Sequence, residues 1–311
     1  MARWKGAFLR TIAFINQKGG VGKTTCTVNV GAALAAMQKR VLLVDMDAQA
    51  NLSLHLGVEV HRLEKSIYTV LTNRSTAREA VFFDLRKNLS LLPANLDLAG
   101  AEIELVNLVG RETVLRTTLS RFLAEEAFDF VLLDCPPSLG LLSLNALLAA
   151  QEVFIPLQTE FFALQGMSRL IDVLELIRGR LGHTIEITGI IPTLYDGRTN
   201  LSREVVSEIQ RFFGDKVFRS IIHSNVKLAE CPSHGKTIFE YAPSSRGAQD
   251  FERLAREILR REGAVPDLEP ALPEPRDSID EVPRRDVASD SSAASGGPDR
   301  LPVVPAPGPL S

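Results

Sequence analysis

The 311-residue sequence has few cysteines, few aromatic residues and no long apolar run. Its three cysteines, Cys26, Cys135 and Cys231, are widely separated and form no CxxC pair, so the sequence contains no cysteine-based metal motif. The longest apolar stretches, such as residues 128–133, fall short of the ~20 residues that a membrane span requires. No long apolar segment follows the basic residues of the first ten positions, so we predict no signal peptide. We expect a cytoplasmic protein.

Composition divides the chain into two parts. Residues 1–262 alternate between strand-like and helix-like segments, and a chain with 45% hydrophobic residues can bury one large core, which predicts a single α/β domain. Residues 263–311 hold ten of the 17 prolines, nine acidic and four basic residues, and few large apolar side chains. Because such a segment cannot offset its ordering entropy by burial, we predict a disordered, acidic, proline-rich tail. The net charge of −3 then leaves +2 on residues 1–262.

The most informative stretch is TIAFINQKGGVGKTT, which begins at Thr11. An apolar run leads into a glycine-rich turn and a helix-compatible segment, the order typical of a phosphate-binding loop. Glycines in this turn allow backbone conformations in which successive N–H groups wrap a polyphosphate. Lys23 supplies a cation for the β- and γ-phosphates, and Thr24 places a hydroxyl at the helix start, where it can ligate Mg²⁺. The stretch favours a nucleoside triphosphate site over a solvated turn.

The loop departs from the common GxxxxGK[ST] pattern. Gln17 stands where the first glycine is expected, and Lys18 adds a second lysine to the loop. From Gln17 to Thr25 the sequence therefore resembles the deviant loop of the ParA/MinD class of P-loop ATPases.

Carboxylates follow two predicted strands. The run VLLV ends in Asp45 and Asp47, and the run FDFVLL ends in Asp134. Carboxylates at the carboxyl ends of parallel strands face the crevice where α/β sheets bind ligands, although an acidic turn capping the next helix is the alternative for the first pair. Asp134 has the pattern of a Walker B carboxylate, which holds Mg²⁺ directly or through water. Pro136 and Pro137 then predict a rigid turn beside the γ-phosphate.

Apolar spacing predicts the remaining elements. We expect helices over residues 24–38, 96–108, 111–126, 141–150, 164–181, 201–213 and 245–261. We expect further strands over residues 41–44, 89–93, 128–134, 153–157, 185–194 and 217–222. Residues 51–88 indicate short helices and loops, and residues 225–239 indicate a loop-rich segment.

Further motifs extend the resemblance. VDMD, LLDCPPSLG, YDGRTNL and SHGK occur in the order found in chromosomal ParA (Soj-type) partition ATPases, and the similarity covers residues 10–261. It implies a doubly wound, mainly parallel β-sheet flanked by helices, with ATP and Mg²⁺ as ligands. It also implies an ATP-dependent sandwich homodimer that binds double-stranded DNA on the nucleoid without sequence preference. A ParB-like (Spo0J-like) protein would stimulate hydrolysis and release the dimer.

The resemblance also assigns roles by position. Lys18 would be the signature lysine that reaches the other subunit's phosphates, and Asp47 would help to position the attacking water. The implied catalytic set is Lys18, Lys23, Asp47 and Asp134, with Thr24 and Asp134 holding the metal. The implied nucleotide contacts are Lys18, Gly19, Gly20, Val21, Gly22, Lys23, Thr24, Thr25 and Asn225. The family's DPQGN motif reads DAQAN here, which keeps Asp47 in place.

The predicted DNA contacts differ more from the family. Arg198 in YDGRTNL matches a DNA-contacting arginine, with a solvated loop cation as the alternative reading. Where relatives commonly have Pro-Arg-Asn, this chain has HSN, so Ser224 replaces a second such arginine. Losing one phosphate contact from each subunit predicts weaker or differently arranged DNA binding. Nearby cations that could compensate are Lys227, which we take as the second candidate contact, Arg219 and Lys236.

Other functions stay open on the sequence. A ParA-like ATPase could position a protein cargo with the nucleoid as its track. A MinD-like membrane-surface ATPase needs a C-terminal basic amphipathic helix, and the acidic, proline-rich end of this chain argues against one. A metabolic P-loop enzyme would need a dedicated substrate site, which no motif indicates.

Overall fold

The computed structural model describes residues 3–4, 7–160, 163 and 167–261. The predicted tail and its boundary at residue 262 lie outside the described residues, as do residues 164–166 of one predicted helix. The strands are β1 (Arg3–Trp4), β2 (Ala7–Phe8), β3 (Arg10–Phe14), β4 (Val41–Asp45), β5 (Phe82–Arg86), β6 (Leu89–Leu92), β7 (Phe130–Asp134), β8 (Glu152–Gln158) and β9 (Glu186–Thr193). The helices are α1 (Lys23–Ala36), α2 (Asn51–His55), α3 (Ile67–Leu71), α4 (Ala77–Ala80), α5 (Leu98–Leu105), α6 (Val114–Glu125), α7 (Leu141–Ala149), α8 (Met167–Leu181), α9 (Asn200–Phe213), α10 (Val226–Glu230), α11 (Ile238–Tyr241) and α12 (Arg246–Arg260). In these ranges, no helix is both long and apolar enough to cross a membrane.

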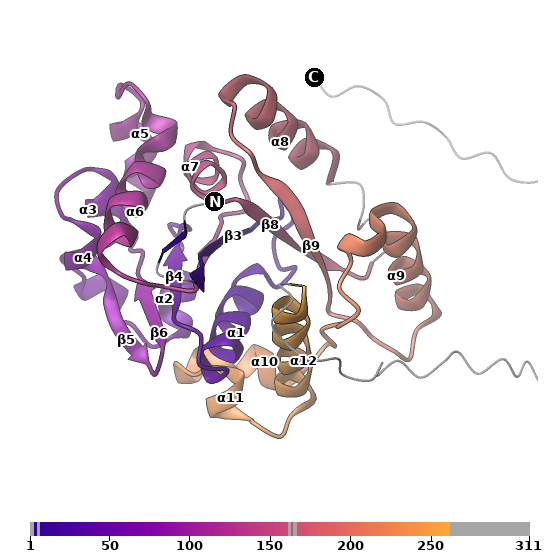
Figure 1. Ribbon diagram of the computed structural model, residues 1–311. Helices are drawn as coiled ribbons and strands as arrows, with labels where there is room; N and C mark the ends of the chain where they lie inside the picture. The colour runs from indigo at the N-terminus through magenta and orange to yellow at the C-terminus, as the bar shows by residue number, and fades with distance from the viewer. Residues whose placement is uncertain (1–2, 5–6, 161–162, 164–166, 262–311) are drawn as a thin grey trace, which may run out of the picture. The chain divides into compact units, whose positions relative to one another are not determined.

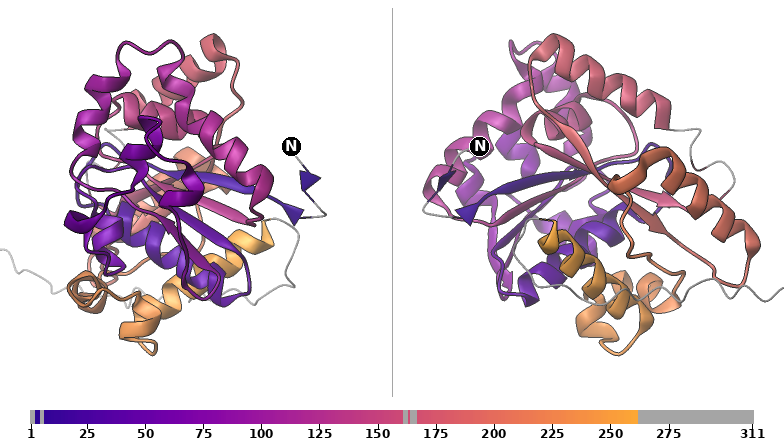
Figure 2. Two further views of the ribbon diagram at one scale, coloured as in Figure 1. Left: turned by 90° about the vertical axis from the view of Figure 1, so that its left-hand side faces the viewer. Right: turned by 45° about the vertical axis from the view of Figure 1, so that its right-hand side comes forward.

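Seven strands form one twisted sheet in the order β5-β6-β4-β7-β3-β8-β9. All neighbours pair in parallel except β5, which runs antiparallel to β6 at one edge. Helices α1 and α12 lie together on one face of the sheet, and α6, α7 and α8 cover the other (Figures 1 and 2). This arrangement confirms the predicted doubly wound, mainly parallel α/β fold.

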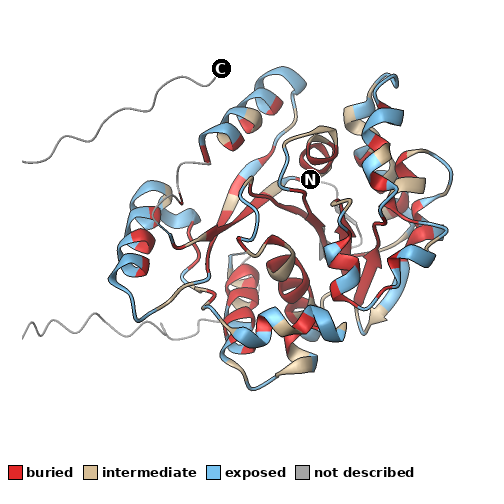
Figure 3. Ribbon diagram, turned by 180° about the vertical axis from the view of Figure 1, so that it is seen from behind, coloured by how far each residue is buried: buried red, intermediate tan, exposed pale blue. Residues whose placement is uncertain are grey.

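The central strands are buried on both faces, which explains their unbroken apolar runs. Every residue of β4 and β7 is buried, and Figure 3 shows the middle of the sheet as a continuous buried layer. Register pairs Asp134 with Phe14 on one side and with Asp45 on the other. The carboxyl ends of β3, β4 and β7 therefore meet at one edge of the sheet, where the sequence places its acidic motifs.

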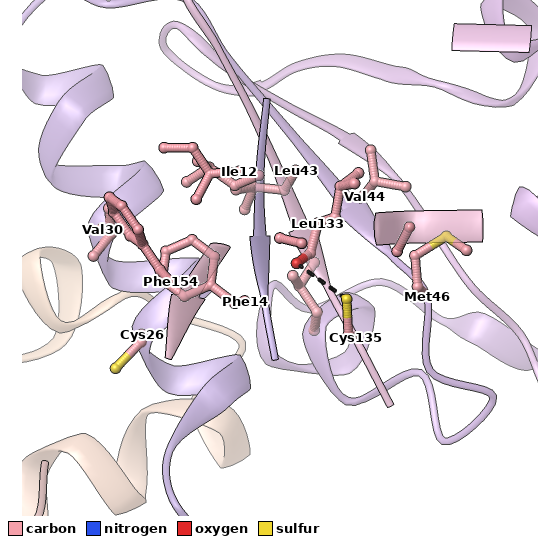
Figure 4. Packing of buried hydrophobic residues seen from close by; sticks show 14 of the residues in the cluster. Ile12, Phe14, Cys26, Val30, Leu43, Val44, Met46, Leu133, Cys135 and Phe154 are labelled. Atoms are coloured by element: carbon pink, nitrogen blue, oxygen red, sulfur yellow. Dashed lines mark hydrogen bonds between the residues drawn. The ribbon is translucent and has the colours of Figure 1, made fainter. Parts of the chain in front are cut away.

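An aromatic cluster supports the strand that leads into the glycine-rich loop. The rings of Phe14 and Phe154 meet edge to face with centroids 5.5 Å apart, and Phe154 meets Phe218 in the same way at 5.2 Å. A Cβ at Gly189 would lie only 2.5 Å from the Phe218 ring, so this position must be glycine. Figure 4 shows Phe14 and Phe154 side by side in the core, with buried Cys26 nearby. We infer that the base of the loop is rigid.

The prediction of a strand over residues 217–222 is wrong. Within this segment, Val217 makes an isolated bridge to β9, and the N–H groups of Phe218 and Ile222 donate to β9 carbonyls at 2.9 Å each. The Glu257 carboxylate of α12 instead accepts the backbone N–H groups of Arg219 and Ser220, each at 2.9 Å. Arg219 and Ser220 therefore interrupt the pairing with β9 between Phe218 and Ile222, and no regular ladder forms.

The edge strand β5 was not predicted within residues 51–88. Its first residues, Phe82 and Phe83, are 38% and 40% exposed, so the strand shows neither an alternating nor a fully buried apolar pattern. Most other elements match their predicted ranges to within about three residues, although the predicted helix over residues 111–126 begins with a 3₁₀ turn, Arg111–Thr113, before α6. The segment of residues 225–239 contains short helices, as α10, the 3₁₀ turn Cys231–His234 and the start of α11.

Candidate active site

The loop between β3 and α1 takes backbone conformations that require glycine at two positions. Gly20 and Gly22 have φ values of 73° and 87°, in the left-handed region. A Cβ built at either position, or at Gly19, would have no other residue within 4 Å, so conformation rather than crowding demands glycine here. The loop is also tied to the far side of the sheet, because the Thr193 hydroxyl of β9 donates to the Val21 carbonyl at 2.8 Å. This hydrogen bond anchors the backbone of the loop to β9.

Lys23, the first residue of α1, is held within this loop. Its side chain is largely buried, and its Nζ donates to the Lys18 carbonyl at 3.3 Å. Burial lowers the pKa of the ammonium, while the nearby carboxylates of Asp134 and Asp47 oppose that shift. Because burial disfavours the charged ammonium, an additional anion beside it would stabilise the charge, which fits a role in phosphate binding.

Asp134 ends β7 against the first turn of α1. The hydroxyl of Thr24 donates to one carboxylate oxygen at 2.7 Å, and that of Thr27 donates to the other at 3.2 Å. Burial, followed by the charge of Asp45 on the neighbouring strand, raises the pKa of Asp134. Asp45 is buried as well, with its pKa raised by burial, and it accepts the N–H and hydroxyl of Ser53 at 2.9 and 2.7 Å.

This donor set fits Mg²⁺. A hydroxyl and a carboxylate in direct contact are the hard oxygen ligands that Mg²⁺ prefers, and a divalent cation would favour the ionised form of the buried Asp134. The sequence predicts Thr24 and Asp134 as the residues that would hold the ion, and their side-chain oxygen atoms lie 2.7 Å apart.

Asp47 lies just beyond the end of β4 and is half-buried. Its backbone N–H donates to Asp45 at 3.3 Å, and its own Oδ1 accepts the N–H of Gln49 at 3.0 Å. The turn thus fixes the carboxylate close enough to Lys23 to affect its pKa.

One cavity joins these groups. It has a volume of about 890 Å³ and is lined by the loop and the first residues of α1, by the Asp47 turn, and by Pro136, Pro137 and Ser138 after β7. A smaller cavity of about 490 Å³, near Leu9 and Phe128, contains none of the predicted residues. Lys23, Thr24 and Asp47 therefore share a single space large enough for a nucleotide.

Lys18 does not engage its own loop through its ammonium group. Its Nζ lies 2.8 Å from Oε2 of Glu160, which follows β8, and both side chains are about half exposed. Such an exposed pair is weak and exchangeable. Lys18 is therefore available for another anionic partner.

The remaining predicted residues lie elsewhere. The Asn225 side chain caps α10 by accepting the Lys227 N–H at 2.8 Å, and Asn225 does not line the cavity. Arg198 is 89% exposed and pairs with Asp196 through two bonds of 2.9 and 2.7 Å. Lys227 pairs with Glu230 at 2.8 Å. The structure does not bring these three residues to the nucleotide cavity.

Sequence reasoning missed several groups at the site. Thr27 is a second hydroxyl on Asp134, and its position one helical turn after Thr24 was a usable signal. His55 borders the cavity with its Nε2 buried and without a hydrogen-bond partner among the described residues, and burial lowers its pKa to about 4. Glu160 and Thr193 act across more than 140 residues of sequence, so no local pattern could identify them.

The fold and this loop define a P-loop nucleoside triphosphatase. A family model described as an AAA domain matches residues 9–187. The chain is 46% identical over 254 residues to the chromosome-partitioning ATPase Soj of Treponema pallidum, covering 82% of this chain and 98% of Soj. It is 43% identical over 254 residues to the chromosome partitioning protein ParA of Caulobacter vibrioides, covering 82% of this chain and 95% of ParA. The chain therefore belongs to the Soj/ParA family of P-loop ATPases.

A solved structure shares the fold. The crystal structure of cobyrinic acid a,c-diamide synthase from Mycobacterium smegmatis, with bound ATP analogue and magnesium, has a TM-score of 0.71 and 35% sequence identity. The match covers 83% of this chain and 97% of that chain. A protein with this fold and a similar sequence thus binds an ATP analogue and magnesium.

Proposed function

We propose that this ATPase segregates DNA in the cytoplasm, on the nucleoid. ATP would bring two copies into a sandwich dimer that binds double-stranded DNA non-specifically, and a ParB-like protein would stimulate hydrolysis and release the dimer. The observation that carries the proposal is the convergence of Lys23, Thr24 and Asp47 on one cavity, together with a second loop lysine that points elsewhere. Two relatives are named as chromosome-partitioning proteins, which supports DNA segregation as the function.

The residues divide the chemistry among them. Lys23 and the loop N–H groups bind the β- and γ-phosphates of ATP, with Thr24 and Asp134 as ligands of Mg²⁺. The metal ion neutralises charge on the phosphates when bound. Asp47 orients the attacking water, since it is a half-buried carboxylate that lines the cavity together with Lys23. Asn225 remains a proposed nucleotide contact that would require the start of α10 to approach the base.

Lys18 should act on the nucleotide of the other subunit. Lys18→Ala should weaken ATP-dependent dimerisation by about 100-fold or more, because each dimer loses two charge-assisted phosphate contacts. ATP binding by the monomer should change little. Size-exclusion chromatography with a slowly hydrolysed ATP analogue measures the first, and titration of a fluorescent analogue into dilute protein measures the second.

Glu160→Gln is the matched control for Lys18. It removes the ion-pair partner at 2.8 Å and leaves the lysine in place, so dimerisation should be at least as strong as in the unmodified chain. If Lys18→Ala dimerises normally, the proposed role in the other subunit is wrong.

Arg198 should contribute to DNA binding. Arg198→Glu should reduce DNA binding of the ATP-bound dimer to near background, because two phosphate contacts per dimer become repulsive. Ser224→Arg should strengthen binding and steepen the log–log salt slope by about 1.8, or about 0.9 for each added contact. Mobility-shift assays at several salt concentrations measure both effects. Arg211→Glu, on the exposed last turn of α9, controls for the general change in charge. Normal DNA binding by Arg198→Glu would exclude Arg198 as a DNA contact.

A further inference from the structure

The two predicted DNA contacts both have carboxylate partners. Arg198 is bound by Asp196 through two hydrogen bonds, and Lys227 is bound by Glu230. A paired cation must exchange its carboxylate for a phosphate, which reduces the net gain on binding DNA. These residues alone give the surface little uncompensated positive charge.

Arg246 differs from both. It is an exposed residue in the first turn of α12, and its Nη2 lies 2.7 Å from Nε2 of His223. Within the described part of the chain, no carboxylate lies within 4 Å of its guanidinium. The arginines of this region that do form ion pairs are Arg253 and Arg256 of α12 and Arg261 just after it. Its positive charge is therefore uncompensated.

A buried carboxylate fixes the imidazole that contacts Arg246. Oδ2 of Asp250, which is fully buried, accepts both the backbone N–H and the Nδ1 of His223, at 3.0 and 2.9 Å. The ring also meets that of Tyr195 edge to face, with centroids 5.2 Å apart. Because Nδ1 donates to Asp250, the Nε2 of the neutral ring is left as an acceptor for the Arg246 guanidinium. Arg253 also donates to Asp250 and helps to balance its charge.

This arrangement lies beside the Arg198 loop. The N–H of Ser224 donates to the carbonyl of Tyr195 at 3.0 Å, and His223 forms a parallel bridge with Tyr195. The loop of residues 195–198 and the segment that contains Ser224 therefore run together. The Arg246 side chain of α12 contacts this segment at His223. His223 directly precedes Ser224, where the family resemblance predicts an arginine.

We propose that Arg246 contacts a backbone phosphate of double-stranded DNA, in place of the arginine absent at Ser224, and that His223 is its positioning residue. This inference rests on the DNA binding proposed above and identifies a residue for it. In the dimer, the two copies of Arg246 supply two phosphate contacts at a fixed separation.

Arg246→Gln tests the contact. It keeps a hydrogen-bond donor at the position and removes the charge, so the log–log salt slope of DNA binding should become shallower by about 1.8, and affinity at 0.1 M salt should fall by about 10- to 100-fold. Arg246→Lys should keep the slope. Arg256→Gln, on the same helix but paired with Glu252 at 2.8 Å, should match the unmodified chain. ATP-driven dimerisation of each preparation checks that the protein is folded.

His223 is tested by a pair of variants. His223→Leu removes the acceptor and leaves the charge of Arg246. The Arg246 side chain of each subunit would then have to be ordered on binding, so affinity for DNA should fall by about 10-fold, while the salt slope stays the same. His223→Gln restores an acceptor and should recover most of the affinity, which a purely structural loss would not show.

The outcomes separate the two proposals. If the unmodified chain binds no DNA in any nucleotide state, the proposed function fails, and this inference fails with it. If the unmodified chain binds DNA but Arg246→Gln keeps both its affinity and its slope, only the role of Arg246 is overturned. Equal affinity for His223→Leu and the unmodified chain overturns the positioning role.

Discussion

Lys23→Ala should lose productive ATP binding. Lys23 is the largely buried cation of the cavity, with its Nζ held over the loop by the Lys18 carbonyl. Removing a buried charge-assisted contact costs about 2–3 kcal/mol, so the Kd for ATP should rise by about 30- to 150-fold. Titration of a fluorescent ATP analogue in the presence of Mg²⁺ measures this change.

Two further variants serve as controls, one for packing at Lys23 and one for the loss of a lysine elsewhere. Lys23→Met keeps the apolar stem and removes only the ammonium, so it should lose ATP affinity as Lys23→Ala does, even if the smaller residue disturbs packing. Lys87→Ala, at an exposed turn between β5 and β6, should bind ATP normally. Unchanged ATP affinity in both Lys23 variants would contradict the assignment of this lysine to the phosphates.

Asp47→Ala should bind ATP but hydrolyse it slowly. Asp47 is half-buried in a turn that follows β4, and its carboxylate faces the cavity shared with Lys23. Loss of a group that positions or deprotonates the attacking water reduces turnover by about 10²- to 10⁴-fold. Phosphate release measures turnover, and the same analogue titration shows that binding is retained.

Asp47→Asn is the sharper variant because it removes the charge and keeps the acceptor for the Gln49 N–H at 3.0 Å. It should be as slow as Asp47→Ala if the charge is what matters. Asp215→Asn, on an exposed 3₁₀ turn, should hydrolyse ATP at the normal rate. Normal turnover in both Asp47 variants would refute the proposed role.

The meeting of the loop with the acidic turns was predictable because each part is encoded locally. A parallel sheet brings the carboxyl ends of its strands to one edge, so the acid after each apolar run necessarily approaches the loop after β3. Lys23, Thr24, Asp47 and Asp134 follow from that rule and from the spacing within the loop. The contact of Thr24 with Asp134 at 2.7 Å joins two motifs 110 residues apart, each readable by itself.

The rest could not be predicted, because it depends on side chains that meet only in the folded chain. Glu257 accepts the N–H groups of Arg219 and Ser220 and so interrupts the strand predicted there, and nothing in that segment indicates it. The Asp250, His223 and Arg246 series likewise joins α12 to a loop. The edge strand β5 was missed because exposure of Phe82 hides its pattern.

The central claim is that ATP controls DNA binding, and DNA co-sedimentation with and without nucleotide tests it most directly. We expect the full chain to sediment with non-specific duplex DNA in the presence of ATP and Mg²⁺, and Asp47→Ala to do so for longer because it retains its ATP. With ADP or no nucleotide, and for Lys18→Ala with ATP, we expect little binding. Equal sedimentation with ATP, ADP and no nucleotide, or none in any of these states, would contradict the account.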